Sequence, residues 1–119
     1  MNSRSERDIH SPGVAIPRQQ TWRAMGRLFQ PRMDRPWSRT HAQMPTVAPI
    51  ANSRLLVLYA SRDAGNRSRV GALVYSLPGF ELESCPGDPV LDLGALGAFD
   101  DAGVMPSSLV WHDGVLYLY

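Results

Sequence analysis

The distribution of hydrophobic and polar residues predicts β-strands through most of the second half of the chain. Two short apolar runs, RLLVLYA over residues 54–60 and RVGALVYS over residues 69–76, are bounded by turn-forming residues. Both are too short for confident helices and are rich in residues that favour strands. A further short strand is predicted near residues 80–84. Residues 62–67 have the Asp, Gly and Asn content of a hairpin loop.

The segment before these strands has a weaker pattern. Its apolar residues recur at spacings that suit a short helix, and they equally suit an extended segment that packs its aromatic side chains: Trp22, Met25, Leu28 and Phe29. Two prolines then interrupt any regular element. Residues 30–40 are therefore predicted to form a loop, with Trp37 as its packing anchor. Residues 1–20 are polar and are predicted to be a disordered leader.

The most informative feature is an internal repeat with a period of about 60 residues. Residues 44–59 align with residues 105–119 when one residue is removed from the turn. Each copy begins with Met-Pro, continues as a strand, turns at Asn52-Ser53 or Asp113-Gly114, and returns as a second strand that ends in Tyr. This order is typical of a β-hairpin. In the first copy two more strands follow, and four antiparallel strands followed by a restart are typical of a propeller blade.

The sequence therefore predicts an all-β fold of the β-propeller type, five-bladed when complete, of which this chain holds about one and a half blades. Blade one is predicted at about residues 44–84 and the start of blade two at about residues 105–119, within an incomplete domain over residues 21–119. The alternative is a small sandwich whose two hairpins match by chance. Residues 115–119 form a predicted strand with no later partner in the sequence. We therefore expect a fragment or truncated reading frame that self-associates through its unpaired blade edge.

The composition of the chain argues against a membrane, metal or cofactor partner. The chain has 119 residues, of which 44% are hydrophobic, and no apolar run approaches the ~20 residues that cross a bilayer. The N-terminus also lacks the apolar segment of a signal peptide. We therefore expect a cytoplasmic protein with no membrane partner. The single cysteine, Cys85, suggests no catalytic or metal site, and we expect no metal and no cofactor.

Arginine is concentrated in the first third of the chain. Residues 1–40 contain eight Arg and three acidic residues, whereas the remainder contains four Arg and eight acidic residues. A basic arm can bind nucleic acid. These Arg residues are scattered among Pro, Ser and Gln with few aromatic residues, so a solvated leader is favoured and we expect no nucleic-acid partner.

Three segments carry a family resemblance. They are Trp37 with HAQMPT at residues 41–46, YASRD at residues 59–63 with the Gly, Arg and Ser that follow, and GAFDDAGVMPS at residues 97–107. Together they resemble the N-terminal part of bacterial proteins in the five-bladed glycosidase-like propeller superfamily. That superfamily includes the family 43 arabinanases and xylosidases, the family 32 invertases and the family 130 mannoside phosphorylases. The resemblance covers about residues 22–119 and is more specific for the superfamily than for an activity.

The resemblance implies carboxylates at the starts of the inner strands of successive blades: a base or nucleophile, an orienting Asp and an acid Glu. Cleaving a glycosidic bond requires one carboxylic acid to protonate the leaving oxygen and one carboxylate to attack or to activate water. Asp100 and Asp101 are the candidates for the second-blade carboxylate, just before a predicted inner strand. Where the first-blade carboxylate is expected, the chain has His41 and Gln43. We expect the third blade, with its acid Glu, to lie outside this chain.

Each candidate also has a purely structural interpretation. Asp100 and Asp101 either orient the sugar and its acid or cap the connection into Gly103. His41 either acts as a base or sugar ligand or braces the loop around Trp37.

The loop pair Arg62-Asp63 likewise has a functional and a structural interpretation. Arg62 can reach a substrate oxygen, or the two residues can form a local salt bridge. The salt bridge is favoured, because a hairpin loop uses Asp for structural reasons.

Two classes of function remain open. The first is a carbohydrate-active enzyme, a hydrolase or glycosyl-transferring enzyme, in which Asp100 or Asp101 orients the substrate. The second is a non-catalytic carbohydrate-binding or interaction propeller, in which His41, Gln43 and the Asp pair hydrogen-bond a sugar over Trp37. Both predict a carbohydrate or glycoside as partner. We expect this isolated chain to have no catalytic activity, because its site lacks an acid.

Overall fold

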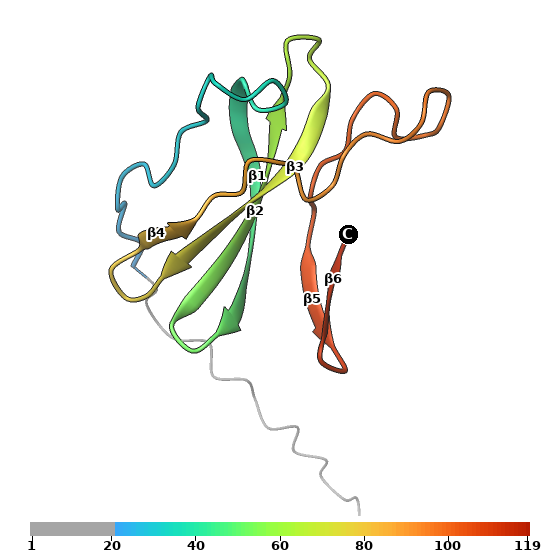
Figure 1. Ribbon diagram of the computed structural model, residues 1–119. Coiled ribbons are helices and arrows are strands. Elements are labelled where there is room, and N and C mark those ends of the chain that lie inside the picture. Colours follow the sequence, from blue (N-terminus) through green and yellow to red (C-terminus); the bar gives the residue numbers. More distant parts are fainter. Residues whose placement is uncertain (1–20) are drawn as a thin grey trace, which may run out of the picture.

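The computed structural model describes residues 21–119, which form an all-β structure without a helix (Figure 1). The strands are β1 (Thr40–Ala51), β2 (Arg54–Arg62), β3 (Ser68–Ser76), β4 (Glu81–Ser84), β5 (Leu109–His112) and β6 (Val115–Leu118). β1 to β4 form one antiparallel sheet in chain order, and β5 and β6 form a separate hairpin. The predicted disordered leader, residues 1–20, lies outside the described residues. No helix that could span a membrane occurs within residues 21–119.

The strands predicted from the apolar runs are confirmed. β2 continues two residues beyond the predicted run at residues 54–60, and β3 and β4 each agree with their predictions to within one residue. Both predicted hairpin turns also form. Asp113 and Gly114 have φ of 48° and 75°, as a two-residue type I′ turn requires. At the β1–β2 turn Ser53 has a φ of 58°. The prediction of an all-β fold that contains these two hairpins is therefore confirmed.

Ser53 offers a test of backbone strain in the first of these turns. A residue with a side chain pays about 1 kcal/mol or more in the left-handed region, whereas glycine does not. The Ser53 carbonyl accepts a hydrogen bond from the Leu77 N–H at 2.7 Å, and glycine preserves this backbone bond. We expect Ser53→Gly to raise the free energy of unfolding in urea by up to about 1 kcal/mol. The control Ala51→Gly, at the end of β1, should lower it, and a loss of stability in Ser53→Gly would contradict the prediction.

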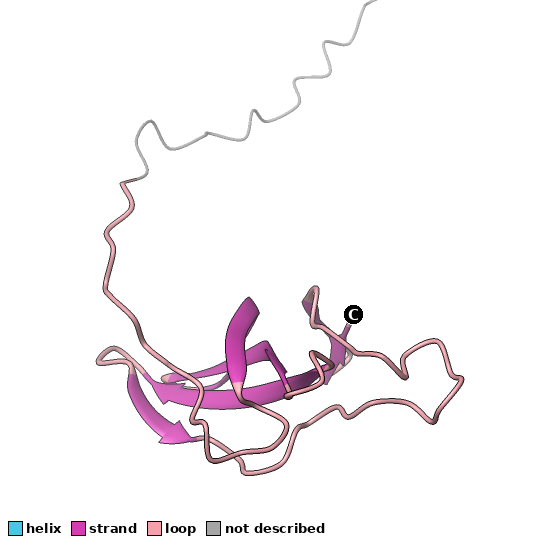
Figure 2. Cartoon of the chain, turned by 90° about the horizontal axis from the view of Figure 1, so that it is seen from above, coloured by secondary structure: helices cyan, strands magenta, loops and turns pink. Residues whose placement is uncertain are grey.

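The four-stranded sheet buries side chains on both faces. On one face, the loop before β1 contributes an aromatic side chain to a buried cluster of Trp37, Tyr59, Leu73 and Tyr75. On the other face, the β5–β6 hairpin covers a second cluster of Leu58, Val70 and Ala72. Seen from above, the strands gather in the middle while the β4–β5 connection extends beyond them (Figure 2). The hairpin thus packs face to face on the sheet.

Residues 21–39 contain no regular secondary structure. Of the two alternatives for this segment, the extended one is found. Its aromatic side chains behave differently: Trp22 is almost fully exposed, while the Phe29 ring lies 4.9 Å from that of Tyr59. Trp37 is 8% exposed, so its predicted role as the packing anchor of the loop is confirmed.

Candidate functional site

The sequence-predicted site residues all lie at one end of the sheet, where β1 begins, β2 ends and β3 begins. Thr40 pairs with Arg62, Arg62 pairs with Ser68, and Ser68 forms a β-bridge with Gly103. Three segments therefore meet there: the loop before β1, the β2–β3 loop and the outer part of the β4–β5 connection (Figure 1). We call this region the loop end.

Within the loop end the candidates are divided among different hollows. Trp37 and Asp63 line a cavity of about 580 Å³, whereas His41 lines a second one of about 350 Å³. Arg62 lines a third of about 270 Å³ together with Asn66, Ser68, Ala102, Gly103 and Met105. We call this third cavity the inner pocket. The Gln43 side-chain amide reaches it by donating a hydrogen bond to the Met105 Sδ at 3.4 Å. The structure thus brings Gln43 and Arg62 to one pocket and separates them from the other candidates.

The start of β1 has an irregular backbone. His41 and Met44 have φ of 64° and 54°, in the left-handed region that residues with side chains seldom adopt. The pairing with β2 shifts register on both sides of Gln43. β-bulges of this kind re-aim side chains, and strained φ values cluster at functional sites. His41 and Gln43 therefore lie within β1, which continues through these bulges back to Thr40.

The two acidic candidates hold the β4–β5 connection together. The Asp101 carboxylate accepts a hydrogen bond from the Gly97 N–H at 2.7 Å. The Asp100 carbonyl accepts from Gly94 at 3.2 Å and from Gly103 at 3.4 Å. These contacts correspond to the capping interpretation. The expected place of the pair directly before an inner strand is wrong, since β5 begins only at Leu109.

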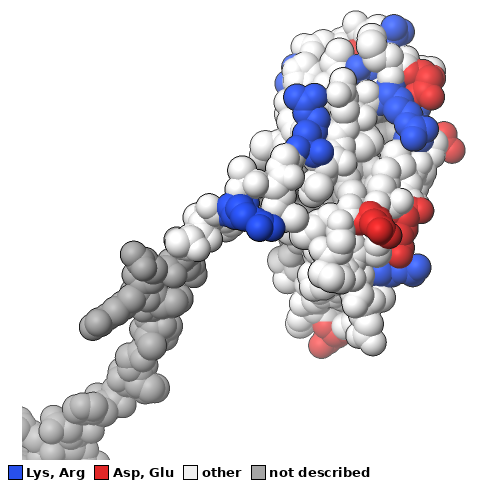
Figure 3. Space-filling view, turned by 90° about the vertical axis from the view of Figure 1, so that its left-hand side faces the viewer, with Lys and Arg blue, Asp and Glu red and all other residues white. Residues whose placement is uncertain are grey.

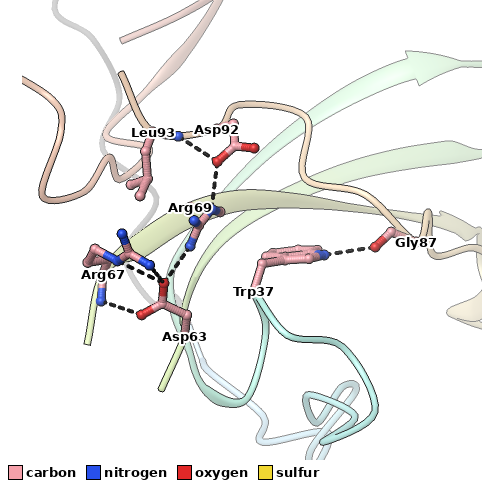
Figure 4. Close-up of polar contacts among 7 residues, drawn as sticks. All are labelled: Trp37, Asp63, Arg67, Arg69, Gly87, Asp92 and Leu93. Carbon is pink, nitrogen blue, oxygen red and sulfur yellow. Dashed lines mark hydrogen bonds and ion pairs between the residues drawn. The ribbon is translucent and has the colours of Figure 1, made fainter. Parts of the chain in front are cut away.

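Asp63 lies at the centre of a charged cluster (Figure 4). Its carboxylate accepts hydrogen bonds from the Arg67 backbone N–H at 2.9 Å, from the Arg67 Nε at 3.0 Å and from the Arg69 Nη1 at 2.8 Å. Arg69 Nε also donates to Asp92 Oδ1 at 2.6 Å. The Asp63 and Arg69 side chains are only 9% and 14% exposed. The cluster therefore ties the β2–β3 loop, β3 and the β4–β5 connection together.

The expected salt bridge between Arg62 and Asp63 is wrong. Arg62 instead donates to the Asn66 Oδ1 at 2.9 Å. The Asp63 carboxylate binds Arg67 and Arg69. The sequence places Asp63 and Arg67 four residues apart, close enough to suggest that they pair. It gives no indication that Asp92 pairs with Arg69, because Asp92 comes from an irregular segment far along the chain.

Burial and ion pairing have opposite effects on the pKa values of this cluster. Desolvation alone would raise the pKa of the Asp63 carboxyl, but hydrogen bonds from Arg69 and Arg67 outweigh it and lower the pKa from 3.8 to about 2. Burial lowers the pKa of Arg69, and its two carboxylate partners more than compensate and raise it. A backbone hydrogen bond from Leu93, assisted by Arg69, lowers the pKa of Asp92. All these groups are charged at neutral pH, which suits structural bracing better than proton transfer.

Trp37 is held firmly in the core. Its indole Nε1 donates to the Gly87 carbonyl at 2.7 Å, and its ring lies 6.4 Å from that of Tyr59. Because the ring is committed to these contacts, it offers little surface on which a sugar could stack.

Charges of both signs mix on the surface near this region. On the side shown in Figure 3, Arg and acidic side chains are interspersed and in places lie next to one another, with no broad area of one sign. A nucleic-acid interface typically shows a basic stripe instead. Within residues 21–119, no group of three His, Cys, Asp or Glu side chains could hold a metal ion.

Two proteins of Mycobacterium tuberculosis strains are similar to this chain. It is 36% identical over 99 residues to the uncharacterized proteins MT1551 and Rv1502. The alignment covers 82% of this chain and 33% of each relative, so the chain spans about a third of the length of the curated relatives it matches. No family model and no solved structure matches the chain.

Proposed function

We propose that this chain forms part of a glycosidase-like β-propeller that binds a carbohydrate or glycoside at the loop end. The contacts between the two hairpin segments carry the proposal. Gln43 donates to Met105, and Trp111 Nε1 donates to the Pro49 carbonyl at 2.9 Å; each pair is 62 residues apart. Radial repetition sets the first strands of a new blade beside the preceding one.

The order of the strands supports the same architecture. Four antiparallel strands form in chain order, and the chain then crosses back so that β5 contacts β1, the first strand of the sheet. A second blade begins in this way beside the inner strand of the first. The mycobacterial relatives are about three times as long as the aligned segment, which leaves room for further blades in proteins of that length.

The inner pocket suits recognition of sugar hydroxyl groups. Arg62, Asn66 and Ser68 line it, and Gln43 lies beside it. The guanidinium group donates hydrogen bonds, and the amide and hydroxyl groups both donate and accept them. Its lining within residues 21–119 includes no carboxylate, whereas glycoside cleavage requires two. We therefore favour carbohydrate binding over turnover by this chain.

A carbohydrate-active enzyme remains the second candidate. Asp101 precedes Ala102, which lines the inner pocket. The Asp101 carboxylate itself accepts a hydrogen bond from the Gly97 N–H, so a role in binding sugar requires that contact to open. In a longer protein, further blades would have to supply the acid.

A panel of p-nitrophenyl glycosides tests the proposal. The panel comprises α- and β-linked glucose, galactose, mannose, xylose and arabinofuranose, with binding followed by saturation-transfer NMR and cleavage by p-nitrophenolate release. We expect binding of at least one glycoside without cleavage. Gln43→Ala and Arg62→Ala should each weaken that binding by about tenfold, as expected for loss of a hydrogen bond to a buried or charged group.

Glu81→Ala is the matched control, because Glu81 is exposed in β4 at the opposite end of the sheet. It should leave binding unchanged. Absence of binding across the panel, or equal loss in all three variants, would contradict the proposed site. Release of p-nitrophenolate by the chain would favour the enzymatic alternative instead.

A further inference from the structure

Arg62 is unusual among the arginines of residues 21–119 because it is half-buried and has no acidic partner there. Three arginines in this part of the chain are half-buried: Arg35, Arg62 and Arg69. Arg69 pairs with two carboxylates, and Arg35 donates to two backbone carbonyl oxygens. No ion pair within residues 21–119 includes Arg62. A cation that is partly removed from water is costly without a counter-charge, so Arg62 lacks the partner that its burial favours.

The side-chain hydrogen bond that Arg62 makes holds its guanidinium in place without neutralising it. Its Nη1 donates to the Asn66 Oδ1 at 2.9 Å. Asn66 is fixed in turn, since its backbone N–H donates to the Asp63 carbonyl at 3.0 Å. An amide oxygen carries no charge, and a guanidinium has several N–H donors. Most of these donors are therefore left for another acceptor.

The acidic side chains nearest to Arg62 and to the inner pocket in the sequence are bound elsewhere. The Asp63 carboxylate accepts hydrogen bonds from two other arginines, and the Asp101 carboxylate accepts one from the Gly97 N–H. Among residues 21–119, Arg62 is the only charged residue in the lining of the inner pocket. The charge of this lining is therefore single and positive.

The backbone around the inner pocket is preformed. Ser68 is only 5% exposed, and its carbonyl accepts a hydrogen bond from the Val104 N–H at 2.9 Å. A Cβ at Gly103 would lie 2.5 Å from the Ser68 Oγ, so the close approach of these two segments requires glycine. Because both segments are already fixed, a ligand that binds between them pays little to order them.

We propose that the glycoside of the inner pocket carries a carboxylate, as a uronic acid does, and that Arg62 binds this group. The inference rests on the sugar binding proposed above. A guanidinium and a carboxylate are both planar and form two parallel hydrogen bonds. One carboxylate also matches the single positive charge of the lining, whereas a phosphate monoester carries about two negative charges at neutral pH. The neutral polar side chains beside Arg62 are left for the sugar hydroxyl groups.

Matched pairs of glycosides test this assignment. p-Nitrophenyl β-glucuronide differs from the β-glucoside, and the β-galacturonide from the β-galactoside, only in the oxidation of the terminal carbon to a carboxylate. Isothermal titration calorimetry measures the Kd of each. In at least one pair we expect the acidic sugar to bind at least about tenfold more tightly, as a hydrogen bond to a charged group provides. Added salt should reduce this preference.

Two variants take the charge of Arg62 away from the ligand in different ways. Arg62→Gln replaces the guanidinium by a neutral amide. Asn66→Asp keeps Arg62 but places a carboxylate where the amide oxygen now accepts its hydrogen bond. Each variant should bring the affinities for the acidic and the neutral sugar close to each other. Arg54→Gln is the matched control, because it makes the same change of charge at the other end of β2, where Arg54 pairs with Glu83. It should preserve the preference.

The outcomes separate this inference from the proposed function. If the neutral glycosides bind and their acidic counterparts bind no more tightly, the inference is overturned and the sugar site stands. If none of these glycosides binds, the sugar site is contradicted as well. Tighter binding of p-nitrophenyl β-glucoside 6-phosphate than of the glucuronide would overturn the choice of a carboxylate.

A preference that survives both Arg62→Gln and Asn66→Asp would overturn the role of Arg62. Far-ultraviolet circular dichroism checks that each variant is folded. Because Asn66→Asp leaves the Arg62 side chain in place, it decides the question if Arg62→Gln unfolds.

Discussion

Gly71→Ala is expected to lower the free energy of unfolding by about 2–3 kcal/mol, at the upper end of the usual cost of overpacking a core. Gly71 pairs with Tyr59 in the middle of β2 and β3, beneath two aromatic rings. A Cβ at this position would lie 2.6 Å from the Tyr59 Cζ and 2.7 Å from the Trp37 Cη2. Both distances are far below van der Waals contact, so at least one ring must move.

The rings have little freedom to move. Trp37 is fixed by the hydrogen bond of its indole to the Gly87 carbonyl, and Tyr59 is covered by Phe29. Urea unfolding followed by tryptophan fluorescence would measure the loss. Trp37→Phe removes Cη2, one of the three atoms that crowd the new methyl group, so Gly71→Ala should cost less in that background than in the natural one.

Gly87→Ala is the matched control for this prediction. A Cβ at Gly87 meets no heavy atom within 4 Å, and its backbone φ lies outside the left-handed region. We expect a change within about 0.5 kcal/mol, as for most surface substitutions. A similar cost at both positions, or no cost at Gly71, would contradict the role given to close packing.

The elements with a strong local pattern could be predicted from the sequence. The runs that became β2 and β3 alternate little because both faces of the sheet are buried, yet their β-rich composition and bounding turns identified them as strands. Asp113-Gly114 identified the second hairpin for a similar reason, since few other dipeptides tolerate two positive φ values. A glycine inside a strand suggests close approach of another group. The sequence does not reveal that two rings from separate segments meet at Gly71.

The candidate site was less accessible to sequence reasoning. The repeat predicted that Asp100 and Asp101 directly precede an inner strand, whereas β5 begins only at Leu109. It did not reveal the bulges around Gln43, because a bulge changes register without a distinctive composition. Asp63 appeared to be a turn residue, and its partners Arg69 and Asp92 come from a strand and an irregular segment respectively. Long-range charge pairs of this kind depend on tertiary structure that local spacing does not encode.

Asp63→Asn is expected to lower the free energy of unfolding by about 2 kcal/mol at neutral pH, within the range for hydrogen bonds to charged groups. The substitution keeps the size of the side chain and removes its charge. Arg67 then loses its charged partner and Arg69 keeps only Asp92, although Arg69 is largely buried. The β2–β3 loop and β3 would be held less firmly to each other and to the β4–β5 connection.

The dependence of this loss on pH distinguishes charge from packing. The pKa of Asp63 is about 2 in the folded protein against an ordinary value of 3.8, so the unfolded chain takes up the proton first as the pH falls. The stabilisation by the carboxylate is therefore complete above the ordinary pKa and is lost as the pH falls through the folded value. Urea unfolding of both proteins from neutral pH downward should show their stabilities converging as the pH approaches about 2. Asp113→Asn, at a side chain that is 90% exposed, should show a small difference that does not vary in this way. A loss in Asp63→Asn that stays constant over the whole range would mean that the shape of the side chain, rather than its charge, braces the loop end.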